Sequence, residues 1–419
     1  MLPKSSYTQG FFQAVWFAGR QIGWLAIGVL LFLSLWIVLP APNFFLLQLA
    51  VGAPEISPLL GGLSAIALFL TLWLIPSPPR TVVAILLMAI ALNALPLLQQ
   101  PQAVARAERS MNQAFADPIV DSSNGQLAPI PAFSLFNFFG GIPKTEVRHQ
   151  AKIPFATPAG ESLFLDLYQP PSAGQYPAVM MIYGGGWRTG NSSENEALGR
   201  FLAGRGYVVI AADYRHTPKY QFPAQLEDVE AALAFVCDRA DEYEIDRRHI
   251  ALLGWSAGAQ LAMLMGFQAS APSAGQPALP PPIAPVQAVI SFYGPVDLDN
   301  GYRNPPRPDP LDVRQVLQAY LGGSPDQQPT AYAAASPITY VKAADPNTLP
   351  PVLLIYGGRD HIVEAKYGKY LYEQLLRSRN TAVWVKIPWA EHAFDKIFNG
   401  VSNQMALHFL ERFLAETLS

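Results

Sequence analysis

The run Gly254–Gly258 reads Gly-Trp-Ser-Ala-Gly and follows an apolar segment that ends at Leu253. In a sharp turn from a strand into a helix, the central Ser256 stands clear of the backbone, where its hydroxyl can act as a nucleophile. Glycines on both sides avoid the clash that a Cβ would cause in such a turn. The run therefore predicts a nucleophilic serine, with the N–H of Ala257 beside it at the start of a helix.

Two further side chains could activate this serine, because a hydroxyl needs a base and the base needs an acid to orient it. Asp360 and His392 each lie in a loop that follows a predicted strand. Loops after parallel strands meet at the carboxyl edge of a sheet, and the chain order serine, acid, histidine is the one expected when the serine occupies a strand-to-helix turn. We therefore expect Ser256, Asp360 and His392 to form a catalytic triad with His392 as the base.

Two other residues stay open as alternatives for these roles. Asp297 follows the predicted strand 286–292 and could supply the acid, although capping of a turn is the simpler interpretation. His216 follows the predicted strand 207–212 and is the other histidine expected near the serine. The neighbouring Asp213 and Arg215 are interpreted as a structural ion pair.

Three adjacent glycines occur in the run Tyr183–Trp187 (Tyr-Gly-Gly-Gly-Trp), which follows another predicted strand. Glycines leave backbone N–H groups unshielded, and such donors can hold the negative oxygen of a tetrahedral intermediate. We expect the N–H groups of Gly185, Gly186 and Ala257 to form this oxyanion hole. An ordinary glycine turn is the alternative, whereas a phosphate-binding P-loop is excluded because no Lys-Ser or Lys-Thr follows.

The elements that must position these residues begin near residue 147, where short apolar runs alternate with helical patterns. This alternation predicts an α/β domain with a mostly parallel sheet and helices on both of its faces. The predicted strands span residues 163–167, 178–183, 207–212, 249–253, 286–292, 352–356 and 382–387. The predicted helices span residues 224–243, 257–267, 364–377 and 403–418.

The first hundred residues differ in composition from the rest of the chain. The whole chain has 28 basic and 31 acidic side chains. Only four of them fall in residues 1–105, namely Lys4, Arg20, Glu55 and Arg80. Residues 21–39, 59–75 and 81–98 are apolar and long enough to cross a bilayer as helices, which takes about 17–25 residues. We therefore predict that residues 1–98 form an all-α transmembrane region of about three helices in contact with membrane lipid. A cleaved leader and buried helices of a soluble domain are the alternatives. Residues 43–51 are also apolar but too few to span a bilayer.

The distribution of basic residues predicts an orientation for this integral membrane region. Lys4 and Arg20 precede the first span, and Arg80 separates the second span from the third. By the positive-inside rule these segments face the cytoplasm, so the chain after residue 98 emerges on the non-cytoplasmic side. Arg106 and Arg109, just past the third span, oppose this orientation.

Residues 99–146 are rich in Gln, Pro, Ala, Ser and Asn and lack a sustained helical or strand period, which predicts a linker. Four phenylalanines gather near its end, at Phe133, Phe136, Phe138 and Phe139. The simplest interpretation is that they pack against the following domain, and contact with the membrane surface or with an entrance to the site are the alternatives.

Charge and cysteine content exclude other kinds of function. The formal net charge is −3 and no cluster of Lys and Arg occurs, so the chain lacks the electrostatic footprint of a nucleic-acid-binding protein. Cys237 is the sole cysteine, which excludes an intrachain disulfide and any cysteine-based metal cluster.

Residues 147–419 resemble the α/β-hydrolase fold, and within it the branch of hormone-sensitive-lipase-like and feruloyl-esterase-like carboxylesterases. The resemblance rests on the Tyr183–Trp187 loop, the run Asp213-Tyr214-Arg215, residues 222–229, the Ser256 turn and residues 336–341. It implies hydrolysis of a small-molecule carboxylic ester and implies no metal or organic cofactor. The predicted attachment to a bilayer adds lipid-soluble esters to the candidate substrates. We expect Trp187 and Trp255 to contact the substrate.

Two positions depart from the pattern of this family. Tyr183 stands where the family has a histidine that braces the oxyanion loop, so a phenol must brace it in a different geometry. Trp255 precedes the nucleophile where Asp or Gly is common, and in this it resembles prolyl-oligopeptidase-like peptidases. The leading hypothesis is a membrane-anchored serine esterase; a serine peptidase and a non-catalytic hydrolase-like binding module are the alternatives.

Overall fold

The computed structural model describes residues 6–115, 130–268 and 286–418, with side chains from residue 21 onward. Its centre is an eight-stranded sheet in the order β1-β2-β4-β3-β5-β6-β7-β8. The strands are β1 (Arg148–Ala156), β2 (Leu163–Gln169), β3 (Tyr176–Ile182), β4 (Val208–Ala212), β5 (Ile245–Trp255), β6 (Val286–Phe292), β7 (Val352–Gly357) and β8 (Ala382–Ile387). β2 pairs antiparallel with β1 and β4, and all the other neighbours are parallel. The predicted α/β fold with a mostly parallel sheet is confirmed.

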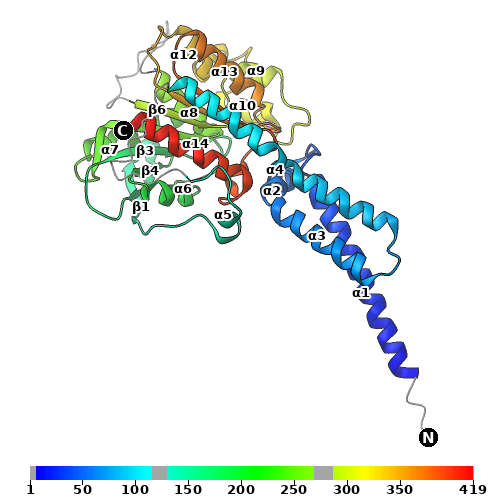
Figure 1. Ribbon diagram of the computed structural model, residues 1–419. Helices are drawn as coiled ribbons and strands as arrows, with labels where there is room; N and C mark the ends of the chain where they lie inside the picture. The colour runs from blue at the N-terminus through cyan, green and yellow to red at the C-terminus, as the bar shows by residue number, and fades with distance from the viewer. Residues whose placement is uncertain (1–5, 116–129, 269–285, 419) are drawn as a thin grey trace.

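Helices connect the parallel strands and pack on the sheet (Figure 1). They are α6 (Glu196–Ala203), α7 (Ala224–Asp238), α8 (Ala257–Gln268), α9 (Leu298–Arg303), α10 (Val313–Leu321), α11 (Pro329–Ala334), α12 (Pro337–Ala343), α13 (Ala365–Arg377) and α14 (Val401–Leu418). Successive residues of a strand point to opposite faces of the sheet. Because every residue of β4 and of β7 is buried, both faces are covered, as is usual for parallel strands.

Each predicted strand overlaps an observed one, but the sequence did not reveal β1. This strand lies at the edge of the sheet and is only partly buried. Its pairing with β2 is interrupted by two register shifts, one of them beside Lys152, whose φ is +56°. Such irregularity removes the regular alternation of apolar and polar side chains that marks a strand in a sequence.

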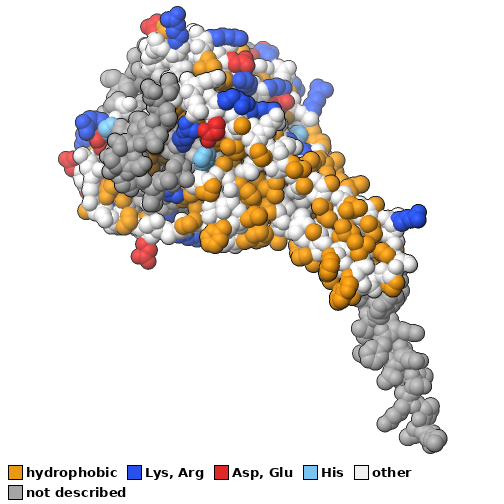
Figure 2. Space-filling view, viewed as in Figure 1, with side chains coloured by type: hydrophobic (Ala, Val, Ile, Leu, Met, Phe, Trp, Pro, Cys, Tyr) orange, Lys and Arg blue, Asp and Glu red, His pale blue; other side chains and the backbone are white. Residues whose placement is uncertain are grey.

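An arm of helices precedes the sheet domain and projects from it (Figure 1). Its helices are α1 (Ser6–Leu35), α2 (Phe44–Glu55), α3 (Ser57–Leu74) and α4 (Arg80–Ala114). Among the described helices, α3 and α4 are long and apolar enough to cross a membrane, whereas the described apolar part of α1 is shorter. Only 22% and 28% of the most apolar stretches of α3 and α4 are buried, so most of these side chains face outward (Figure 2). A core helix of a soluble domain would be mostly buried.

Helix α4 continues far beyond the predicted third span. Its second half lies along the edge strand β8, where Ser110 Oγ accepts a hydrogen bond of 2.9 Å from the N–H of Trp384. Core side chains recur at every fourth position of this half, at Ala103, Ala107 and Met111. The predicted linker is therefore wrong for its first residues, which are helical. The sequence obscured this because proline usually marks a helix end, whereas Pro96, near the end of the predicted span 81–98, is inside the helix.

A short helix, α5 (Leu135–Gly140), lies between the arm and β1. The predicted packing of the phenylalanine cluster against the domain holds for only part of it. Phe133 packs against the core and Phe138 is buried, whereas Phe136 and Phe139 are 78% and 64% exposed. Two aromatic side chains of this helix therefore remain available for another surface.

Candidate active site

Ser256 occupies a tight turn between β5 and α8. Its φ is +50°, a left-handed conformation that costs energy in any residue with a Cβ. The N–H of Ser256 donates a hydrogen bond of 2.9 Å to the carbonyl of Phe292, which fixes the turn to β6. A Cβ on Gly254 would clash with the backbone of Gly258, and a Cβ on Gly258 would clash with the carbonyl of Ile182. The two glycines therefore allow the close approach of strand and helix that exposes the serine.

His392 and Asp360 converge on this serine from two loops. The Nε2 atom of His392 lies 3.0 Å from Ser256 Oγ, and its Nδ1 atom lies 2.7 Å from Asp360 Oδ2. The other oxygen of Asp360 accepts hydrogen bonds of 2.8 and 2.7 Å from the N–H groups of Ile362 and Val363, which fixes the carboxylate plane. The structure thus brings the three predicted residues into one hydrogen-bonded chain.

The loops after β7 and β8 are held to one another. Glu391 Oε1 accepts hydrogen bonds from the N–H of its neighbour His392 at 3.0 Å and from the N–H of His361 at 2.7 Å. Its other oxygen lies 2.5 Å from His361 Nδ1. A Cβ on Gly357 would lie only 2.5 Å from the carbonyl of Ala390, so the loops pack in close contact. The spacing between the carboxylate and the imidazole depends on this packing.

The surroundings of His392 favour its acceptance of a proton. Burial lowers the pKa of the imidazole, but the charge and the hydrogen bond of Asp360 together with the nearby carboxylates outweigh burial, so the pKa is raised above its usual value. Glu391 and Asp395 act in the same direction. Tyr293 packs against the imidazole with 4.4 Å between ring centroids and donates a hydrogen bond to Asp395. The ring of Tyr293 thereby limits movement of the histidine.

The loop of three glycines lies beside the serine. Gly185 and Gly186 have φ of +110° and +62°, and a Cβ on Gly185 would clash with the carbonyl of Thr189. Gly186 and Ala257 line the same cavity as Ser256, whereas Gly185 is not among its lining residues. Ala257 is the first residue of α8, where N–H groups have no acceptor within the helix. Of the three expected oxyanion donors, Gly186 and Ala257 therefore lie at the cavity beside Ser256.

Tyr183 braces this loop in place of the family histidine. Its hydroxyl lies 2.9 Å from His216 Nε2 and 3.3 Å from the carbonyl of Tyr214, and its ring stacks on Tyr214 with 4.4 Å between centroids. Gly190 leaves room for the phenol, since a Cβ there would clash with the ring. His216 therefore supports the back of the loop, and burial lowers the pKa of its imidazole.

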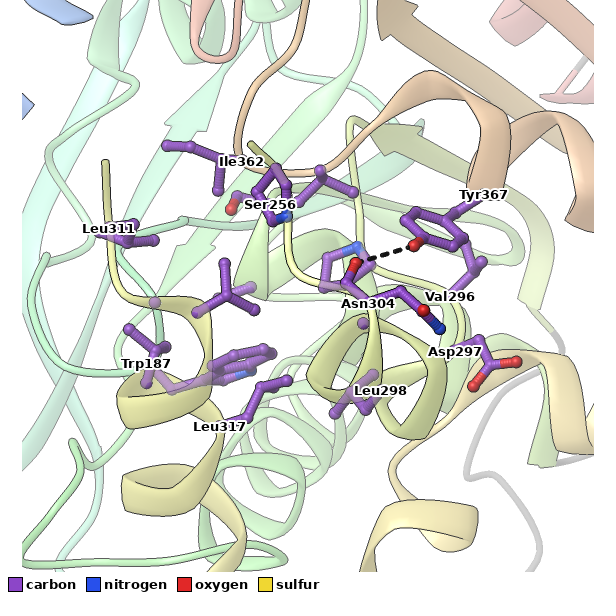
Figure 3. A pocket seen from close by; sticks show the side chains of 18 residues that line it. Trp187, Ser256, Val296, Asp297, Leu298, Asn304, Leu311, Leu317, Ile362 and Tyr367 are labelled. Carbon is purple, nitrogen blue, oxygen red and sulfur yellow. Dashed lines mark hydrogen bonds between the residues drawn. The ribbon is translucent and has the colours of Figure 1, made fainter. Parts of the chain in front are cut away.

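A cavity of about 650 Å³, open mouth included, adjoins Ser256 (Figure 3). Its walls are largely apolar and come from the Ser256 turn, from α9, α10 and the segment between them, and from the region after Asp360. The apolar lining side chains include Trp187, Val296, Leu298, Leu311, Val313, Val316, Leu317, Ile362 and Val363. Such a cavity suits the hydrocarbon part of a small molecule.

Of the two tryptophans expected to contact a substrate, the structure brings one to the cavity. Trp187 lines it, with its indole stacked on Tyr320 at 4.0 Å and its N–H donated to Gln260 at 3.1 Å. Trp255 is buried, packs against Phe292 and is not among the lining residues. Trp255 points into the core because strand residues alternate between faces of the sheet.

The alternatives for the triad take other roles. Asp297 caps α9 by accepting the N–H of Asn300 at 3.0 Å, although it also lines the cavity. The predicted ion pair of Asp213 with Arg215 is wrong. Arg215 pairs instead with Asp228 at 2.8 Å, while Asp213 accepts the N–H of Ser192 at 2.7 Å, so the two side chains have different partners.

Sequence reasoning missed several lining residues. Ile362 and Val363 could have been suspected from their place directly after Asp360, but Tyr367, on α13, carried no signal. The hydroxyl of Tyr367 donates a hydrogen bond of 3.1 Å to the carbonyl of Asn304, which joins two walls of the cavity (Figure 3). The stretch 270–285, which is rich in proline, lies outside the described residues.

Comparison with known proteins shows that the chain is similar to esterases. The BD-FAE family profile matches residues 165–375. A Mycobacterium tuberculosis protein named "Probable carboxylic ester hydrolase LipM" is 28% identical over 381 residues, which cover 87% of this chain and 83% of that protein. Esterase LipC from the same organism is 31% identical over 57% of this chain and 58% of its own. The structure of esterase Est2 from Thermogutta terrifontis has 25% identity and a TM-score of 0.51 over 65% of this chain and 92% of that one. A bacterial heroin esterase, at 22% identity and a TM-score of 0.54 over 65% and 84% of the two chains, shares the fold.

Proposed function

The chain belongs to the BD-FAE family of α/β-hydrolase carboxylesterases and is a carboxylic ester hydrolase, and from this premise we propose that Ser256, His392 and Asp360 are its catalytic triad. The observation that carries the proposal is the unbroken hydrogen-bonded chain from Ser256 Oγ through His392 to Asp360. Its serine end borders the apolar cavity, where the acyl carbon of a substrate can reach the hydroxyl.

The reaction follows from this arrangement. Ser256 Oγ attacks the acyl carbonyl while His392 Nε2 takes its proton, and the carboxylate of Asp360 stabilises the imidazolium. The N–H groups of Gly186 and Ala257, with that of Gly185 as a third candidate, hold the oxyanion. As the tetrahedral intermediate collapses, His392 gives the proton to the departing alkoxide, which leaves as the alcohol. Water then attacks the acyl-enzyme while His392 takes its proton, and His392 returns this proton to Ser256 Oγ as the carboxylic acid leaves.

A comparison of leaving groups tests this function. The full-length chain in detergent is assayed with short-chain p-nitrophenyl esters and with aminoacyl anilides. Ester cleavage that greatly exceeds anilide cleavage is expected, because the lining of the cavity is largely apolar. Asp297 is the one charged side chain among its described lining residues. Preferential anilide cleavage would identify a peptidase, and no turnover of either substrate would identify a non-catalytic binding module.

The cavity also supports a proposal about substrate class. Its largely apolar walls, which include Trp187 and Leu317, suit an acyl chain. Fully buried CH₂ groups contribute about 0.8 kcal/mol each, so an ester whose chain fills the cavity gains binding energy that acetate lacks. We therefore propose apolar esters, including lipid-soluble ones, as substrates.

Substitution of Gly301 by leucine tests whether this cavity holds the acyl chain. Gly301 lines the cavity on α9, and a Cβ there would meet nothing within 4 Å, so the new side chain can extend into the cavity without a backbone clash. For an octanoyl ester, kcat/KM is expected to fall about tenfold or more, while for an acetyl ester it stays within about threefold. The acetyl ester is the internal control, and an unchanged chain-length profile would contradict the assignment.

We further propose that the arm anchors the enzyme in a membrane. The outward-facing apolar side chains of α3 and α4 support this proposal, as do the exposed aromatic side chains of Phe44 and Phe45 on α2. Phe136 and Phe139 of α5 give the sheet domain a second apolar surface for contact with the interface. With Lys4, Arg20 and Arg80 on the cytoplasmic side, the sheet domain lies outside the cytoplasm.

A further inference from the structure

The inner end of the arm contacts the loop that carries Asp360. The guanidinium of Arg359, the residue before Asp360, donates a hydrogen bond to the carbonyl of Ile37 in the turn after α1. Ile362, two residues after Asp360, packs against a set of side chains that we name the arm cluster. The arm cluster consists of Trp36, Ile37, Ala41, Leu47, Ala50 and Ala53. Because Ile362 also lines the cavity, the arm reaches the wall of the active site.

A second contact joins α2 to the start of α14, the helix that follows the His392 loop. Glu55, the last residue of α2, is fully buried, and its Oε2 atom accepts the N–H of Ser402 at 2.8 Å. The first N–H groups of a helix lack acceptors within the helix, so this carboxyl is a cap supplied from 347 residues away. Gly400 permits the approach, because a Cβ there would clash with the same oxygen.

Both contacts are close to the reacting side chains. The N–H of Arg359 donates a hydrogen bond of 3.0 Å to the carbonyl of Ala390, so the Asp360 loop and the His392 loop are joined directly. Between His392 and α14, Asp395 accepts the hydroxyl of Tyr293, whose ring packs against the imidazole. Helix α2 contacts this same segment as well as α14. Movement of the arm would therefore displace segments on both sides of His392.

We propose that Arg359 and Glu55 are positioning residues, through which the arm holds the Asp360 and His392 loops in the geometry required for proton transfer. The proposal rests on the triad mechanism above and extends it, because the arm then supports catalysis as well as attachment. Neither residue is among those that line the described cavity, so each acts through the loop that it holds. A misplacement of about 1 Å at a reacting group can lower turnover about 10²-fold.

Burial determines what each substitution removes. Desolvation raises the pKa of Glu55 to about 8, with a smaller contribution from Asp395, so its carboxyl is neutral at pH 7. A glutamine at position 55 is therefore neutral, similar in shape and still able to accept the N–H of Ser402. An alanine leaves this buried N–H without its acceptor. For Arg359, a lysine keeps one donor for the carbonyl of Ile37, whereas an alanine keeps none.

The first test compares variants of the full-length chain in detergent on a soluble short-chain ester. Glu55→Ala is expected to lower kcat about tenfold or more with KM within about twofold, while Glu55→Gln keeps kcat within about threefold. Glu411→Ala is the matched control, because Glu411 is also buried and accepts a remote backbone N–H, that of Ile130, at 2.8 Å. Thermal unfolding of each variant separates loss of folded enzyme from loss of turnover.

The second test uses Arg359 and remains informative if Glu55→Ala does not fold. Arg359→Ala is expected to lower kcat about tenfold, and Arg359→Lys to restore most of it. Asp360 raises the pKa of His392, and the neutral imidazole is the active base. If Arg359→Ala displaces Asp360 from His392, the pKa of His392 falls. The acid limb of kcat/KM then moves to lower pH in this variant. A purely structural role would leave this limb in place.

The outcomes separate this inference from the mechanism on which it rests. Equal kcat in Glu55→Ala and Glu411→Ala, together with an unmoved acid limb in Arg359→Ala, would overturn the positioning role. Ser256→Ala is measured in parallel with these variants. If Ser256→Ala is inactive, the triad stands and only the positioning role is lost; if it remains active, the mechanism itself fails.

Discussion

Replacement of Ser256 by alanine is expected to lower kcat for a short-chain ester by roughly 10⁴- to 10⁶-fold. The substitution removes the atom that attacks the acyl carbonyl and leaves the cavity, the glycine loop and the His392–Asp360 pair in place. The residual rate would come from binding and from the oxyanion donors alone. Initial rates with the full-length chain in detergent, at saturating ester, give the comparison.

A remote serine serves as the control for this loss. Ser110→Ala removes a buried hydroxyl that accepts the N–H of Trp384 on the edge strand and makes no described hydrogen bond to the proposed triad. We expect this variant, normalised to folded protein, to retain the parental kcat within about threefold. Turnover by Ser256→Ala comparable to that of Ser110→Ala would contradict the proposed nucleophile.

Asp360→Asn is expected to lower kcat about 10⁴-fold while the fold is kept. An asparagine can still accept the N–H groups of Ile362 and Val363 with its oxygen, so its amide nitrogen then faces His392 Nδ1. That donor selects the tautomer with the proton on Nε2, and this tautomer cannot take a proton from Ser256. The pKa of His392 also falls, because the charge that raises it is lost. Measurement of kcat against pH, together with thermal unfolding, tests both effects.

Asp297→Asn is the matched control, since Asp297 is the other carboxylate that the sequence offers for this role. Its oxygen caps α9 by accepting the N–H of Asn300, and asparagine caps helices about equally well. Because Asp297 also borders the cavity, a modest change within about tenfold is expected. A larger loss in Asp297→Asn than in Asp360→Asn would move the role of the acid to Asp297.

The residues of the proposed triad could be predicted because their signals are local and the topology joins them. The Ser256 turn needs glycine on both sides, and the structure gives the reason in the clashes that a Cβ at Gly254 or Gly258 would cause. Asp360 and His392 follow parallel strands, so their meeting is a consequence of strand order. Fold class and the candidate triad therefore depend on short patterns that a single sequence displays.

The cavity and the role of the arm could not be predicted in the same way. Trp255 was expected to contact the substrate, but whether a side chain lines a cavity depends on the face of the strand and on distant packing. Arg215 was paired with its sequence neighbour, whereas its partner Asp228 lies on α7. The contact of Glu55 with Ser402 joins residues with no shared sequence pattern, and only the folded chain reveals it.

The central claim is that Ser256 is an activated nucleophile, and labelling with a fluorophosphonate tests it most directly. The full-length chain in detergent is treated with the probe and digested, and the modified peptide is identified by mass spectrometry. We predict one label per chain, on Ser256, absent from Ser256→Ala and formed much more slowly in Asp360→Asn. A label on another residue, or an unlabelled parent chain that still hydrolyses esters, would contradict the account.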